Sequence, residues 1–115
     1  MTYVPLHVHS FYSLLDGFGS PKANVERAKG LGISALGITD HGTISGHVSH
    51  WEACKKAGIK PILGVELYVV HKPASLRDKT NRDNSHMVIW AKNKQGWLDL
   101  IKLVSYTNDP SIFYY

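Results

Sequence analysis

The sequence predicts an α/β domain in which about four β/α units form a parallel sheet. Short apolar segments alternate along the chain with segments of helical periodicity, and short turns containing glycine join them. The chain has 115 residues and a mass of 12.8 kDa, whereas a closed α/β barrel needs about 200 residues or more. We therefore expect either an open sheet or a chain that forms part of a larger domain.

The first β/α unit begins close to the N-terminus. Residues 3–8 are short and apolar enough for a buried strand, which ends at the polar residues His7, His9 and Ser10. Ser20 and Pro21 then supply an N-cap and a first-turn proline for a helix that runs to about Lys29.

The remaining units follow the same alternation. Gly58 is placed to end the second helix. A polar segment without periodicity, residues 72–85, is expected to be a surface loop. The predicted strands are residues 33–39, 59–70 and 87–91, the predicted helices are residues 45–57 and 95–105, and a tail covers residues 106–115.

Composition limits the classes of protein to consider. The chain is 43% hydrophobic and 19% charged, and it has no apolar run near the ~20 residues of a membrane span. No basic segment followed by an apolar one marks a secretory signal. A lone cysteine, Cys54, fits a reducing compartment and a buried position, so we expect a cytoplasmic protein without membrane contact. The net charge of +4 is compatible with a polyanionic partner such as DNA.

Histidine is the unusual residue, with seven in the chain, about three times its ordinary frequency. His7 and His9 are separated by one residue at the end of the first predicted strand. In extended backbone both imidazoles leave the same face, roughly 7 Å apart, and can converge on one metal site. Taken alone, such a pair can equally be two hydrogen-bonded side chains at a strand end.

Other polar residues follow the ends of neighbouring strands. Asp40 and His41 end the second strand, and strand ends share one rim in parallel α/β folds. Glu66 lies between apolar residues, where a carboxylate needs a cation or a hydrogen-bond donor. Asp16 and His86 can complete a His/carboxylate site suited to zinc, manganese or iron.

The other candidate features favour structural roles. His47 and His50 share a helix face but lack carboxylates at matching positions, and His71 borders the polar loop. The glycine-containing segments GFGS and DHGTISG do not match a phosphate-binding or dinucleotide-binding loop. Ser10 and Ser13 lie near His9 in the sequence, but no acid is identifiable that would orient a serine–histidine pair for catalysis. No catalytic residue is therefore assigned.

Four segments resemble, in order and spacing, the PHP (polymerase and histidinol phosphatase) domain at the N-terminus of the bacterial replicative DNA polymerase III alpha subunit. They are LHVHSFYSLLDG, GITDHGTISG, AGIKPILGVELYV and HMVIWAKNKQGWLDLIKLVS, and together they cover nearly the whole chain.

The resemblance implies a distorted seven-stranded (βα) barrel, of which this chain would form a part. It also implies up to three divalent metal ions at the barrel rim, with Asp40 supporting a ligand rather than binding metal. In active relatives the chemistry would be phosphoester hydrolysis at the 3′ end of DNA, that is, 3′–5′ exonuclease activity. The residues that match the family's ligands are His7, His9, Asp16, His41, Glu66 and His86.

The chain also departs from the family. Members continue with further strands and an Asp-X-His pair, and the closing Phe113, Tyr114 and Tyr115 resemble an interior segment, which suggests a truncated, split or trimmed chain. His86 falls at the start of the fourth predicted strand, the wrong end under the parallel-barrel rule. Either the preceding loop brings it to the rim or the strand runs in the other direction.

Three functions remain open from the sequence. The chain can be a polymerase PHP-domain fragment with a metal site and weak or absent nuclease activity. It can be a free-standing metal-dependent phosphoesterase for a small phosphate ester. It can also be a non-catalytic scaffold for the rest of a polymerase or for replisome subunits. An incomplete barrel leaves a parallel edge and apolar surface exposed, so we also expect homo-oligomers.

Overall fold

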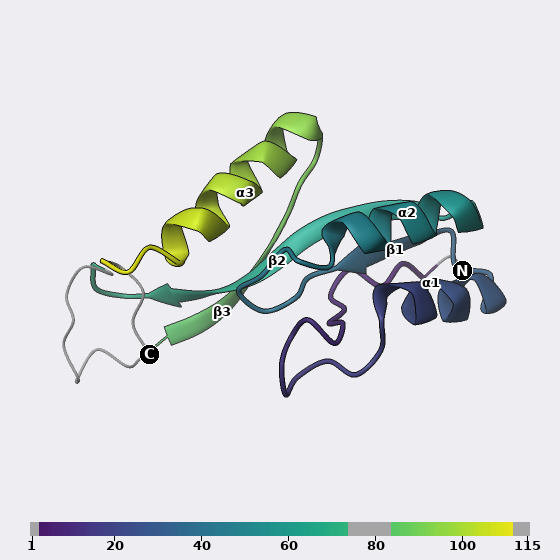
Figure 1. Ribbon diagram of the computed structural model, residues 1–115, viewed down its shortest axis with the longest axis horizontal. Coiled ribbons are helices and arrows are strands. Elements are labelled where there is room, and N and C mark those ends of the chain that lie inside the picture. The colour runs from purple at the N-terminus through teal and green to yellow at the C-terminus, as the bar shows by residue number, and fades with distance from the viewer. Residues whose placement is uncertain (1–2, 74–83, 112–115) are drawn as a thin grey trace.

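A three-stranded sheet forms the centre of the computed structural model, which describes residues 3–73 and 84–111. Figure 1 shows α1 and α2 at one end of the sheet and α3 at an angle beside β2 and β3. The elements in chain order are α1 (Pro21–Gly30), β1 (Ala35–Ile38), α2 (His47–Ala57), β2 (Lys60–Val70), β3 (Asn84–Trp90) and α3 (Lys94–Thr107).

The sheet is mixed, so the prediction of a purely parallel sheet is wrong. β1 pairs with β2 in parallel through the crossover helix α2, as predicted, but β2 and β3 pair antiparallel. A parallel partner for β2 would need a crossover connection, usually a helix. The sequence between Val70 and Asn84 has no helical periodicity. The described residues form an open sheet in the order β1-β2-β3 and not a closed barrel.

The first predicted strand, residues 3–8, is an irregular extended segment rather than a strand. Pro5 has no N–H to donate, and the N–H of Val8 donates to Thr39 Oγ1 at 3.0 Å instead of to a backbone carbonyl. The segment still lies against β1, because the N–H groups of Gly37 and Thr39 donate to Pro5 O and Val8 O, both at 2.8 Å. It therefore brings His7 and His9 to the end of β1.

Local signals in the sequence predict all three helices to within a few residues. Ser20 Oγ accepts from Ala23 N at 3.1 Å and caps α1. Gly58 ends α2 with a φ of 74°, a left-handed conformation that glycine adopts without steric cost. Asn93 caps α3 by accepting from Gly96 N at 2.9 Å.

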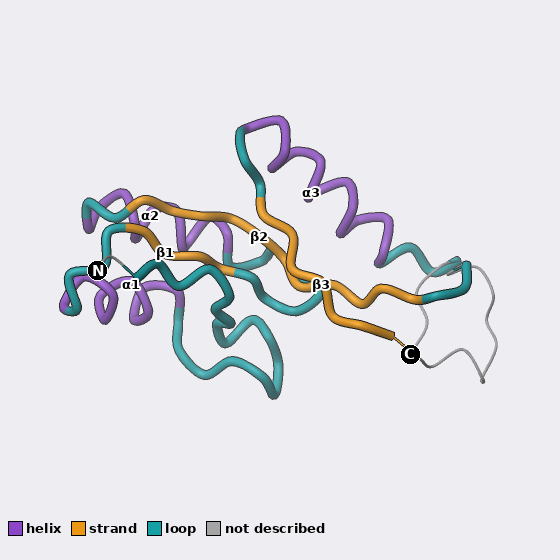
Figure 2. Tube along the Cα trace, turned by 180° about the vertical axis from the view of Figure 1, so that it is seen from behind, coloured by secondary structure: helices purple, strands orange, loops and turns teal. Residues whose placement is uncertain are grey.

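Two small apolar cores lie apart from each other, the first between α1, α2 and β1 and the second between β2 and α3. The first contains Val25, Leu36 and Cys54 and packs α1 and α2 against β1. The second contains Val65, Leu67 and Leu100 and packs α3 against β2. Figure 2 shows the corresponding separation of α3 from the α1 and α2 pair. Cys54 is fully buried, as predicted, and burial raises the pKa of its thiol to about 11.

Some predicted segments fall mostly outside the described residues. Of the polar loop expected over residues 72–85, the structure describes 72–73 and 84–85, and the last two belong to β3. Of the predicted tail, α3 takes the first two residues, and Phe113, Tyr114 and Tyr115 lie outside the described part. Within the described part, every helix is too short or too polar to cross a membrane.

Candidate metal centre

The six residues predicted as metal ligands lie together where β1 ends, beside the middle of β2. They come from the extended N-terminal segment, the loop after it, the end of β1, and the strands β2 and β3. Two groups have one nitrogen or oxygen atom per residue within 4.8 Å of one another: His7, His9 and Glu66, and His41, Glu66 and His86. Glu66 is common to both groups.

Glu66 is a buried acid between these two groups of imidazoles. Its side chain is 4% exposed, and Oε2 lies 2.7 Å from His9 Nε2 and 3.3 Å from His7 Nε2. Oε1 lies 2.8 Å from His86 Nδ1. Within the described part of the chain, every ion pair of Glu66 is with a histidine.

The surroundings of Glu66 favour the ionised carboxylate. Burial alone would raise its pKa, but hydrogen bonds from His86 and His7, with the charges of His7 and His9, hold the pKa below its ordinary value. An ionised carboxylate with imidazoles at both of its oxygens is suited to ligate divalent cations.

His41 is fixed next to Glu66 by the backbone. The two residues form an isolated parallel bridge beyond β1, and Gly42 N donates to Glu66 O at 2.8 Å. His41 Nδ1 lies 3.7 Å from Glu66 Oε2, while His41 Nε2 is buried without a hydrogen-bond partner. A buried ring nitrogen that makes no hydrogen bond is energetically costly, and binding a metal ion would remove that cost.

Asp16 lies at the margin of the cluster. A tight turn places it there, in which a Cβ on Gly17 would lie 2.0 Å from Ser10 O. Its carboxylate contacts His9 Nδ1, the ring nitrogen opposite the one that faces Glu66, and lies 4.0 Å from His41 Nδ1. Asp16 is in neither ligand group, and its contact fixes the orientation of the His9 ring.

Asp40 is buried beneath the cluster and contacts backbone and hydroxyl groups. Ser10 Oγ donates to one carboxylate oxygen at 2.8 Å and Ser13 Oγ to the other at 3.2 Å. Ser13 Oγ also accepts from His41 N at 2.7 Å. Asp40 thus connects the loop that carries Asp16 to the backbone of His41, which is a supporting position.

His86 reaches the cluster because β3 runs antiparallel to β2. The start of β3 lies beside the end of β2, and His86 is in register with Tyr68. The strand direction in the sequence prediction was therefore wrong for this strand, which removes the conflict over His86.

Tyr68 is a residue of the site that the sequence analysis missed. Its ring centroid lies 4.4 Å from that of His41 and 4.9 Å from that of His86. Tyr68 follows Glu66 by two positions in β2, so strand alternation places both on one face. That spacing was the available signal.

The arrangement fits divalent metal ions. Ligands about 2.1 Å from an ion lie roughly 3.0–3.4 Å from one another, and the His7 and His9 Nε2 atoms are 3.0 Å apart. Mixed imidazole and carboxylate ligands suit zinc, manganese or iron. The side chains of His7 and His86 are each 51% exposed, so the cluster is open to solvent on one side.

The histidines of α2 belong to the fold and lie outside these groups. Both are buried, and their Nε2 atoms bond to backbone carbonyls: His47 to Gly64 O at 2.8 Å and His50 to Leu36 O at 3.0 Å. Burial lowers the pKa of each ring, which keeps both imidazoles neutral.

Comparison with known proteins gives relatives over the whole chain. It is 42% identical over 118 residues to DNA polymerase III subunit alpha of Treponema pallidum and 39% identical over 119 residues to that of Chlamydia pneumoniae. The two matches cover 99% and 100% of this chain but only 10% and 9% of those relatives, and they lie in the relatives' N-terminal region.

Solved structures share the fold. A Bifidobacterium adolescentis protein described as a metal-dependent phosphoesterase superposes with a TM-score of 0.66 at 26% identity, covering 92% of this chain and 33% of that one. An amidohydrolase from Chromobacterium violaceum, with bound sulfate, gives a TM-score of 0.62 at 25% identity, covering 86% of this chain and 32% of that one.

The family model for the PHP domain matches residues 5–115, a range that contains every residue of the candidate metal centre. With the relatives found over the same range, this match shows that the chain belongs to the PHP-domain family.

Proposed function

We propose that this chain is a metal-dependent phosphoesterase domain in which His7, His9 and Glu66 hold one divalent ion and His41, Glu66 and His86 hold a second. The observation that supports this most directly is the position of Glu66, a buried acid common to both groups, with Oε2 towards His7, His9 and His41 and Oε1 towards His86. Asp16 is proposed to orient or complete the site, and Asp40 to hold the supporting loop.

The bound ions would supply a water of lowered pKa and positive charge for the phosphate oxygens. The imidazoles must be neutral to bind metal, so protons compete with the ions and acid should lower activity. Tyr68 packs against His41 and His86 and limits the movement of both rings.

The proposed substrate is the 3′ end of a DNA strand, cleaved in the 3′–5′ direction. The similarity to DNA polymerase III alpha subunits supports DNA as the substrate, and the net charge of +4 is compatible with it. The proposed partners are DNA, the remainder of a polymerase chain and replisome subunits, in the cytoplasm.

A free-standing phosphoesterase that acts on a small phosphate ester is the second candidate. The similarity to a structure described as a metal-dependent phosphoesterase favours it. Turnover of a labelled 3′ DNA end, compared with turnover of para-nitrophenyl phosphate, distinguishes the two substrates.

Metal content tests the site itself. Protein purified without chelator should carry about one to two ions per chain, and Glu66→Gln should lower this several-fold because both ligand groups lose their carboxylate. Glu26→Gln is the control, since Glu26 is exposed on α1 and pairs only with Lys22 in the described part of the chain. Equal metal content in wild type and Glu66→Gln would reject the assignment. Metal-free wild type would instead support the non-catalytic scaffold.

A further inference from the structure

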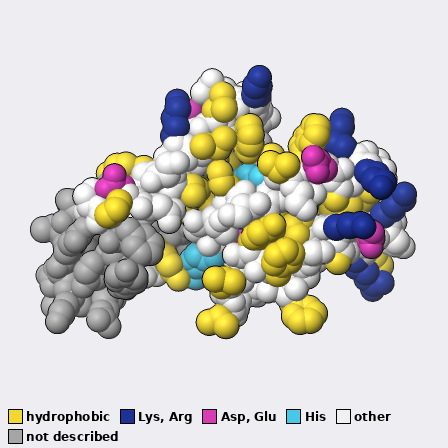
Figure 3. Space-filling view, in the orientation of Figure 1, with side chains coloured by type: hydrophobic (Ala, Val, Ile, Leu, Met, Phe, Trp, Pro, Cys, Tyr) yellow, Lys and Arg dark blue, Asp and Glu magenta, His cyan; other side chains and the backbone are white. Residues whose placement is uncertain are grey.

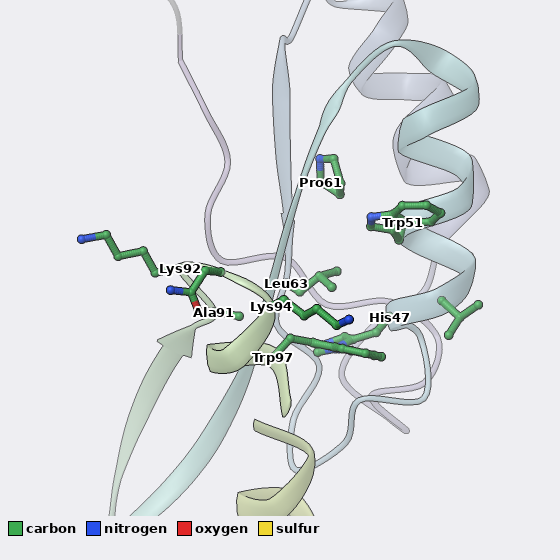
Figure 4. Close-up of a pocket in the computed structure, with 10 residues that line it drawn as sticks. His47, Trp51, Pro61, Leu63, Ala91, Lys92, Lys94 and Trp97 are labelled. Atoms are coloured by element: carbon green, nitrogen blue, oxygen red, sulfur yellow. The ribbon is translucent and has the colours of Figure 1, made fainter. Parts of the chain in front are cut away.

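A pocket of about 540 Å³ lies between α2, β2 and the beginning of α3 (Figure 4). Its volume falls within the range of about 300–1,000 Å³ that is typical of small-molecule sites. Leu63 lines it, on the face of β2 that carries Val65 and Leu67 against α3. Glu66 is on the other face by strand alternation, so the pocket is separate from the metal centre.

Two tryptophans from different helices form the walls of this pocket. Trp51 extends from α2 and Trp97 from the first turn of α3, with Leu63 and Pro61 from β2 nearby (Figure 4). Hydrophobic side chains are exposed on both sides of the space between α2 and α3 (Figure 3).

A hydrogen-bond chain holds Trp97 in place. Its Nε1 donates to His47 Nδ1 at 3.2 Å, and His47 Nε2 donates to Gly64 O at 2.8 Å. Since Trp97 Nε1 is already used, the indole ring is the part of this side chain available to a ligand. Trp51 is 47% exposed.

The charge at the pocket is positive. The Lys94 side chain extends between the two tryptophans in Figure 4, and Lys55 Nζ lies 5.8 Å from the centre of the Trp51 ring. No Asp or Glu is among the described residues that line the pocket. Lys92 belongs to the rim, but its side chain points away.

We propose that this pocket binds a nucleotide, with the base against the indoles of Trp51 and Trp97 and the phosphate at Lys94. Indole rings stack on the flat face of any nucleobase, and a neighbouring lysine attracts the negatively charged phosphate. A free nucleotide and a nucleotide within a single strand offer the same chemistry. The inference does not depend on metal binding at Glu66.

The test is calorimetric titration of the full chain with adenosine monophosphate and with a short oligodeoxyadenylate, both in the presence of EDTA. Trp51→Ala and Lys94→Ala should each weaken binding about tenfold. Trp90→Phe and Lys102→Ala, the latter at an exposed position on α3 outside the pocket, are matched controls and should bind as the wild type does. Trp90 lies outside the pocket, and its Nε1 donates to Leu6 O. Tighter binding of one ligand identifies the source, either the free nucleotide or the strand.

Three results would overturn the proposal: no saturable binding of either ligand, equal binding by wild type and Trp51→Ala, or equal loss in the control variants. Sedimentation velocity tests the other possible occupant of the pocket, a second copy of the chain. Self-association that Trp51→Ala abolishes, without nucleotide binding, would assign the pocket to a second copy of the chain. Glu66→Gln should keep nucleotide affinity while losing metal, so a failure of the metal site is distinguishable from a failure of this one.

Discussion

Glu66 shows at the scale of one residue why the metal centre was visible in the sequence. A carboxylate between Val65 and Leu67 in a buried strand is unfavourable unless cations or donors surround it. In the structure the compensating groups are four histidines, drawn from segments far apart in the chain. The same reasoning missed Tyr68, because an aromatic residue in a strand is ordinary unless its neighbours are known.

Tyr68 is predicted to hold the rings of His41 and His86 for metal binding. Tyr68→Leu should lower zinc affinity about tenfold, measured by equilibrium dialysis, because a loss of packing around ligands leaves them free to turn. Tyr68→Phe keeps the ring and should keep the affinity. Tyr106→Leu, at a similarly exposed position on α3, is the control. Equal affinity in Tyr68→Leu and wild type would show that the ring contacts are incidental.

Asp40 is predicted to be needed for stability more than for metal binding itself. In Asp40→Asn an amide NH₂ replaces an oxygen that accepts from Ser10 or Ser13, and the cost should be about 2–3 kcal/mol in the free energy of unfolding. Urea denaturation monitored by circular dichroism measures it. Asp99→Asn, exposed on α3, should change stability little. A stable Asp40→Asn that no longer binds metal would instead make Asp40 a ligand.

At the scale of elements, helices were predictable because their signals are local. Ser20, Gly58 and the apolar stripe of α3 each act within a few residues of sequence. The direction of β3 was not predictable in this way, because an apolar strand looks the same whichever way it pairs. The lack of helical periodicity in the sequence between Val70 and Asn84 was the informative signal, and the antiparallel pairing of β3 explains how His86 reaches the site.

The helix α2 should make stability depend on pH through its buried histidines. Burial lowers the folded-state pKa of His50 below its ordinary value of 6.5. The hydrogen bond to Leu36 O acts in the opposite direction but is the smaller effect. The unfolded chain therefore binds the proton at higher pH, so this contribution is complete above about pH 6.5 and is lost as pH falls. Each such histidine contributes a slope of up to about 1.4 kcal/mol per pH unit.

This pH effect is measured with urea midpoints between pH 7.5 and 5.0 in EDTA, which removes metal as a cause. His50→Gln keeps a donor for Leu36 O but does not titrate, so its stability should depend less on pH than that of wild type. His71→Gln, at an exposed position, should keep the wild-type slope. A slope unchanged in His50→Gln would show that other groups dominate the acid response.

At the scale of the whole molecule, β2 is the element that joins everything else. Its first half pairs with β1 and packs against α2, and its second half pairs with β3 and supports α3. The dimensions of 47 × 28 × 24 Å fit two small cores that lie apart from each other. The metal centre lies on one face of β2 and the tryptophan pocket on the other, so the strand positions both candidate sites.

A large apolar loop beside the metal centre predicts self-association of the whole molecule. Leu14, Leu15 and Phe18 are 85%, 109% and 99% exposed, and Leu15 adopts a φ of 65°, which is rare for a leucine. An apolar cluster this exposed is typical of a surface that contacts another protein. In isolation, a second copy of the chain is the partner available to cover it.

Sedimentation velocity should therefore show a concentration-dependent dimer. Leu14→Ser with Phe18→Ser should shift the protein towards monomer without changing the cores. Leu31→Ser is the control, because Leu31 is 57% exposed at the end of α1. A single monomeric species at every concentration, with cooperative unfolding, would contradict this prediction. It would mean that the two cores suffice for a stable chain with this loop in water.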